Sequence, residues 1–221
     1  MANSKTDVAA KVRSLHDALN ELYAVNPSWR ARNRWPEEVT GSILHPAASE
    51  REIAAAEQRL GLAFPPSYRE FLSLHRSWEH FWADFTLIGT GDSETERARA
   101  EVEEYVTEQA EDLRKKLGKG FTPEGIAAWE AKEKRFIYLA NQLVIGANFA
   151  GDLWVYDTRS RRPDGEMTLT QWDISYGAQE PEFSTFGEFM EWARSEVENR
   201  IQQTREALAN PRQHAEDDDD E

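Results

Sequence analysis

The side chains that could carry out catalysis are few and poorly grouped in this chain. It has five histidines and no cysteine. His75 and His80 are five residues apart, and this spacing does not place both on one face of a helix. Neither the zinc-binding HExxH pattern nor the GxSxG turn of serine hydrolases is present. We therefore interpret both histidines as core or surface residues, and we predict neither a metal nor a cofactor.

Two further patterns could suggest chemistry, and each has a structural interpretation. Glu52 and Glu57 could form an acid/base pair, but both are placed to cap a helix or to face solvent. The glycine-containing segments 89–91 and 118–120 lack the additional glycines and the Ser or Thr of nucleotide-binding loops. No enzymatic function is indicated, and only catalytic groups distant in sequence could still supply one.

One segment, 75–85, combines four large aromatic side chains with two acids. Aromatic side chains are enriched at the centres of protein interfaces, so this segment is a candidate contact loop. Its predicted partner-binding residues are Trp78, Glu79, Trp82 and Asp84. The alternative is that most of these rings are ordinary core residues, because aromatic side chains also dominate protein interiors.

A second candidate contact lies in segment 148–154, where Gly151 and Asp152 separate two apolar runs. Asp152 and Trp154 are the predicted partner-binding residues there. The alternative for Asp152 is that it stabilises the turn between two strands through its own backbone.

The charge of the chain excludes one class of partner. The 221 residues carry 26 basic and 41 acidic side chains, a net charge of −15. Residues 1–47 have a charge of +1, residues 48–210 have −11, and the remaining tail has −5. Binding to phosphates needs clustered Lys and Arg, so direct binding to nucleic acid is not expected. We interpret the tail as a disordered, solvated segment. The alternative is that its negative charge attracts a basic partner.

Hydropathy and cysteine content set further limits. Without cysteine there is no disulfide framework and no thiolate metal site. No run of 18 apolar residues occurs, so no membrane-spanning segment is predicted. The polar start, 1–7, leads into no apolar segment of a secretory signal, and we expect a soluble cytoplasmic protein.

Local patterns predict helices first and a compact sheet afterwards. Apolar residues repeat at steps of three and four in 7–24, which indicates an amphipathic helix. Ser49 and Glu52 form a capping box ahead of a helix that Gly61 ends, and Pro66 begins the next one. A charged helix is predicted over 94–117, and a further helix follows Thr122. We predict strands at 136–139, 143–147, 153–157 and 166–173, and a long final helix from about Phe183. This order predicts an α+β fold, with a single antiparallel sheet packed against helices.

Three blocks of this sequence resemble one protein family. Residues 52–72 (EIAAAEQRLGLAFPPSYREFL) resemble the hallmark of the SUKH superfamily, which includes the yeast cell-wall-assembly regulator. Residues 143–158 are similar to its strand–Gly-Asp–strand unit, and residues 183–193 to its closing helix. The matching positions of the first block are Glu57, Leu60-Gly61, Pro65, Tyr68 and Phe71-Leu72.

The resemblance implies a domain organisation. We expect an N-terminal helical extension at 1–47 and a SUKH-like domain at 48–210. Within that domain, residues 94–133 look like a helical insertion. Residues 211–221 form the acidic tail.

The resemblance also implies a non-enzymatic binding module, and many bacterial members of the family neutralise toxins. The first hypothesis is an immunity protein that binds a cognate toxin, with a basic nuclease as one candidate. The alternative is a regulatory or scaffold module resembling the cell-wall-assembly regulator, with its terminal helices mediating assembly. An enzyme remains a third hypothesis, which requires a pocket where histidines and acids converge.

Overall fold

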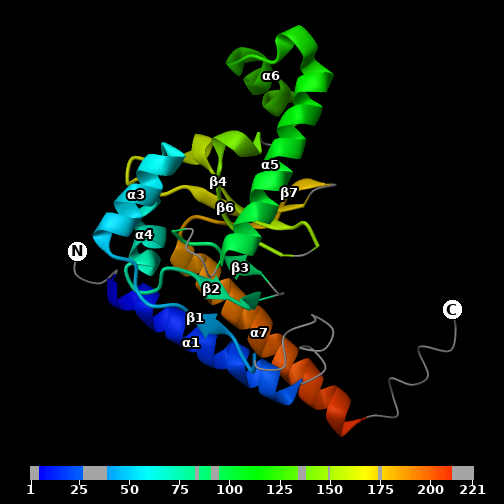
Figure 1. Ribbon diagram of the computed structural model, residues 1–221. Coiled ribbons are helices and arrows are strands. Elements are labelled where there is room, and N and C mark those ends of the chain that lie inside the picture. Colours follow the sequence, from blue (N-terminus) through cyan, green and yellow to red (C-terminus); the bar gives the residue numbers. More distant parts are fainter. Residues whose placement is uncertain are drawn as a thin grey trace, which may run out of the picture.

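The computed structural model describes residues 5–26, 39–82, 85–90, 95–133, 138–148, 150–173 and 176–210 (Figure 1). Within these ranges the chain forms six α-helices: α1 (Lys5–Val25), α3 (Glu50–Leu60), α4 (Pro66–Leu72), α5 (Glu96–Leu117), α6 (Pro123–Glu133) and α7 (Phe186–Ala209). The predicted positions of Asp84 and of the tail lie outside the described residues.

In the described part of the chain, one antiparallel sheet of seven strands runs in the order of the sequence, from β1 to β7. The strands are β1 (Ile43–Leu44), β2 (Trp78–Glu79), β3 (Thr86–Leu87), β4 (Leu143–Ala147), β5 (Leu153–Asp157), β6 (Thr168–Asp173) and β7 (Gly177–Phe183). Each strand pairs with the next along the chain. The α+β fold expected from the sequence is confirmed.

The helix starts and ends predicted from the sequence occur at the expected residues. Ser49 Oγ accepts a hydrogen bond from the Glu52 amide, and the Glu52 carboxylate accepts one from the Ser49 amide at 2.7 Å. Gly61 ends α3 with a φ of 65°, a left-handed conformation that glycine adopts without steric cost. Pro66 is the first residue of α4, where its missing amide hydrogen leaves no helical bond unmade.

Helices α1 and α7 pack along each other, and α4 also contacts both (Figure 1). The apolar residues that predicted the first helix are all buried: Val8, Val12, Leu15, Leu19 and Leu22. On α7, buried residues from Phe186 to Ile201 recur on one face. The amphipathic face of α1 is therefore used within the chain.

The sheet buries side chains on both of its faces. Successive residues of a strand point to opposite faces, and β5 shows the result. Trp154 and Tyr156 join the large core that contains residues of α1, α4 and α7. Leu153 and Val155 join a second core with Ala98 and Val102 of α5. Helix α5 thus covers the face of the sheet that α7 leaves open.

The C-terminal part of α5 and all of α6 extend beyond the sheet (Figure 1). The buried carboxylate of Glu130 anchors α6 to the body, because it accepts a hydrogen bond from the Tyr138 amide at 2.8 Å and pairs with Arg159 at 3.4 Å. Arg159 in turn forms two bonds of 2.7 Å to the carboxylate of Asp157 on β5.

Parts of the sheet differ from the expectation. The strand predicted at 136–139 is wrong over its described residues, since Leu139–Asn141 forms a short 3-10 helix. Strands β1 and β2, with two residues each, carry no pattern that a sequence can show. Strand β7 contains Pro181 and three polar or charged residues, a composition that an edge strand tolerates.

A buried carboxylate joins two helix starts to the sheet. Glu166 accepts hydrogen bonds from the Ser67 amide at 2.7 Å and from Ser67 Oγ at 2.9 Å. Ser67 Oγ accepts a hydrogen bond from the amide of Phe186, the first residue of α7, at 2.9 Å. Glu166 therefore holds the start of α4 directly. The Ser67 side chain links this contact to the start of α7.

Glu166→Gln is expected to alter the pH dependence of stability. Burial raises the pKa of Glu166, although the hydrogen bonds from Ser67 favour its ionised form. A carboxyl group with a raised folded-state pKa stabilises the fold fully below its unfolded-state pKa, and this contribution is lost as the pH rises through the folded value. Urea denaturation of both proteins from about pH 4 to about pH 7 should show the wild type losing stability relative to the variant. A relative gain by the wild type would contradict this.

Candidate partner-binding surface

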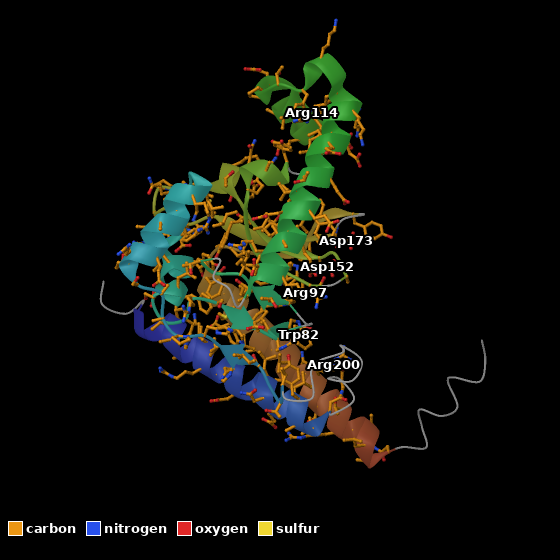
Figure 2. The ribbon with its side chains drawn as sticks, viewed as in Figure 1. Trp82, Arg97, Arg114, Asp152, Asp173 and Arg200 are labelled. Atoms are coloured by element: carbon orange, nitrogen blue, oxygen red, sulfur yellow. The ribbon has the colours of Figure 1, made fainter. Side chains whose placement is uncertain are left out.

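The meander topology gathers three turns at one end of the sheet. Thr86 pairs with Ala147, Ala147 with Leu153, and Leu153 with Trp172. The strand ends next to these paired residues therefore lie in one row, and Trp82, Asp152, Asp173 and Tyr176 lie at or beside them. Figure 2 shows Trp82, Asp152 and Asp173 on the same side of the molecule. We call these four residues the hairpin edge.

Asp152 at this edge is held by its own turn. Its carboxylate accepts a hydrogen bond from Asn148 Nδ2 at 3.0 Å, and its amide donates to Asn148 Oδ1 at 3.0 Å. Gly151 has a φ of 91° in this turn. These hydrogen bonds join Asp152 to Asn148 across the turn, and the charge of the half-buried Asp152 acts on Tyr105 of α5.

An acidic stripe on α5 adjoins Asp152. Glu101, Glu104 and Glu108 share one side of the helix with Tyr105, because their spacing is three or four residues. Burial raises the pKa of Tyr105, and the negative charges of these three glutamates and of Asp152 raise it further. Four carboxylates therefore lie close enough to the Tyr105 hydroxyl to affect its pKa. We call Glu101, Glu104, Glu108 and Asp152 the acidic surface.

The acidic surface continues into a cavity of about 290 Å³ between α5, α6 and β6. Its lining combines three aromatic residues with three acids and one lysine: Tyr105, Trp129 and Trp172, Glu108, Asp112 and Glu133, and Lys116, together with Gln109 and Leu113. We call it the α5–α6 cavity. In the sequence, the signal for this region is the charged helix predicted over 94–117.

The other sequence-predicted residues lie in different environments. Trp78 is 0% exposed, stacks on Phe71 and donates a hydrogen bond from its indole nitrogen to Ser42 Oγ. Trp154 is 1% exposed and packs against Phe189 at a ring distance of 4.5 Å. Both side chains belong to the core. For Trp78, this is the alternative given in the sequence analysis, that most rings of segment 75–85 are ordinary core residues.

Glu79 and Trp82 remain partly accessible. The Glu79 carboxylate pairs with His45 Nε2 at 2.6 Å, and Trp82 packs on the margin of the main core. The structure therefore brings Trp82 and Asp152 to one edge, while Glu79 is engaged with a histidine. Their contact with a partner stays a prediction.

The two histidines singled out in the sequence take part in structural contacts. His75 bonds to the carbonyl oxygen of His45 at 3.1 Å, and burial lowers its pKa. The carbonyl oxygen of His80 accepts a hydrogen bond from the Tyr23 hydroxyl at 3.0 Å. Among the described residues, no group of three or more His, Asp and Glu side chains is placed to hold a metal ion. No helix in the described part of the chain is long and apolar enough to span a bilayer.

These features define an α+β protein in which helices cover both faces of an antiparallel meander, with an acidic, aromatic recess between α5, α6 and β6. Residues 47–192 match the SMI1/KNR4 family (SUKH-1), and the chain belongs to this family. Proteins of the SUKH-1 family are typically immunity proteins of polymorphic toxin systems and are generally non-catalytic. The comparison with curated proteins found no match.

Proposed function

We propose that this protein is an immunity protein that binds a cognate toxin and neutralises it by direct protein–protein contact. The match of residues 47–192 to the SUKH-1 family carries this proposal. The net charge of −15 supports a basic toxin as the partner, and a nuclease is a candidate because many nucleases are basic.

The acidic surface and the hairpin edge are the proposed contact region. Opposite charges on two partners raise the rate of their encounter and align them before contact. Trp82 and Tyr176 would supply apolar contact area beside the carboxylates, and Tyr176 is 68% exposed. Trp78 and Trp154 would act from the interior by holding the strands that present these turns.

The proposed mechanism is occlusion. The protein covers the active site of the toxin, or a surface beside it, and makes or breaks no covalent bond. The affinity then depends on burying the aromatic contacts while pairing the carboxylates with basic side chains of the toxin.

The alternative function is that of a regulatory or scaffold module. The match to the SMI1/KNR4 family is compatible with this alternative as well. That function would use the terminal helices for assembly. However, the apolar faces of α1 and α7 are buried against each other and the body, which leaves less apolar surface for a partner. Recovery of several cellular partners, without a toxin gene beside this one, would favour the alternative.

Co-expression tests the immunity function. A toxin encoded beside this gene is expected to stop growth when expressed alone and to be tolerated when this protein is co-expressed. The purified protein should bind an active-site variant of the same toxin. If no adjacent toxin is bound or neutralised, the proposal falls.

A further inference from the structure

The α5–α6 cavity has the size of a site for one side chain. Its volume is about 290 Å³, at the lower limit of the range for small-molecule sites. It lies where α5 leaves the sheet and α6 folds back, and Figure 2 shows Arg114 on this projecting part of α5. The neighbouring acidic surface makes the approach to it negative.

The lining of the cavity favours a cation. Tyr105, Trp129 and Trp172 line it together with three acids, Glu108, Asp112 and Glu133. The Asp112 carboxylate pairs with Lys115 at 3.1 Å, and Glu108 and Glu133 are the other two carboxylates. A cation is stabilised by the negative face of an aromatic ring and by nearby carboxylates.

The chain already places a cation at this position. Lys116 Nζ lies 5.9 Å from the ring centre of Trp129 and 3.6 Å from a carboxylate oxygen of Glu133. The Lys116 side chain is 60% exposed, so it can swing into solvent at little cost. A guanidinium group stacks on aromatic rings and pairs with carboxylates better than an ammonium group, because it is planar and more weakly hydrated.

The walls of the cavity are held in place before any partner binds. Glu130 fixes α6 to the Tyr138 amide and to Arg159. On α5, Gln109 accepts a hydrogen bond from the Leu139 amide at 2.7 Å. The Arg114 guanidinium lies 5.0 Å from the ring centre of Phe121 and joins the end of α5 to the turn before α6. A rigid site loses little conformational entropy on binding.

We propose that the α5–α6 cavity binds an arginine side chain of the partner protein, which displaces Lys116 from Trp129 and Glu133. The inference rests on the proposed function for the identity of the partner. The cavity itself can be tested without any toxin.

The probe is the tripeptide Gly-Arg-Gly with blocked ends, and its control contains citrulline, a neutral isostere of arginine. Titration into the full-length protein is followed by the NMR signals of the indole N–H groups, with Trp129 assigned through Trp129→Phe. The arginine peptide is expected to shift the Trp129 signal and to bind about 5-fold or more tightly than the citrulline peptide. Equal binding of the two peptides, or no shift at Trp129, would overturn the proposal.

Lys116→Met should strengthen binding of the arginine peptide by about 3-fold or more, because it removes the competing ammonium group. Lys119→Met is the matched control, since it makes the same charge change at an exposed residue outside the cavity lining. Glu133→Gln should weaken binding by a similar factor. If Lys116→Met behaves as Lys119→Met does, displacement of Lys116 is wrong.

The two proposals fail separately. Peptide binding with the expected ranking, but no toxin neutralised, would reject the immunity function and leave the cation site standing. A toxin that is neutralised equally by the wild type, Glu133→Gln and Lys116→Met, with unchanged affinity, would reject the role of the cavity and leave the immunity function standing.

Discussion

Trp154→Ala is expected to lower the free energy of unfolding by about 3–5 kcal/mol, the range for truncating a buried aromatic side chain. The Trp154 ring contacts four aromatic rings from three other elements or loops: those of Phe85, Phe183, Phe189 and Trp192. Its removal leaves a cavity where β5 meets α7, and the surrounding elements can close it only in part. Urea denaturation followed by circular dichroism measures the loss.

Two variants separate packing from contact at this hairpin. Trp154→Phe keeps an aromatic ring in the core and should lose less than half of the free energy of unfolding that Trp154→Ala loses. No hydrogen bond is broken by this change, since the indole Nε1 has no hydrogen-bond partner among the described residues. Asp152→Asn changes the neighbouring turn and should alter stability far less. A Trp154→Ala protein of unchanged stability but lost toxin binding would show that Trp154 contacts the partner directly.

Neutralising two carboxylates of the acidic surface is expected to slow association with a basic toxin. For the wild type, the association rate constant should fall on the order of 10-fold or more from low to physiological salt, because salt screens the attraction. Glu104→Gln with Glu108→Gln should lower the rate at low salt and flatten its dependence on salt. Stopped-flow mixing at several salt concentrations measures both.

The control for this experiment carries the same change in net charge elsewhere. Glu196→Gln with Glu198→Gln neutralises two carboxylates on α7 and also raises the net charge by two. If steering depends on the acidic surface, the α7 variant should associate nearly as fast as the wild type. Equal slowing by both variants would mean that only total charge matters, and no slowing by either would reject electrostatic recognition.

Much of the fold could be predicted because its signals are local. The capping box at Ser49, the left-handed Gly61 and Pro66 act within one turn of a helix, so neighbouring residues suffice to reveal them. The stripe of α1 and the apolar runs of β4 and β5 are periodic in the same way. These patterns, with the blocks that resemble the SUKH superfamily, determined the fold class and the family.

The site was harder to predict, because exposure depends on what packs over a residue. Trp78 and Trp82 are four residues apart in one aromatic segment, yet the first is buried in β2 and the second lies at the margin of the core. Trp129 and Trp172 lie 43 positions apart in the sequence, and they line one cavity only because α6 folds back along the end of α5, next to β6.

Sequence patterns alone thus specified most helices, the central strands, the negative charge and the family. Folding established which aromatic rings are interior, which acids lie near Tyr105, and that α5 and α6 form a recess beside the sheet. The physical reason is that helix caps and apolar periodicity act between near neighbours. Burial and the local electric field sum over groups that only the folded chain brings together.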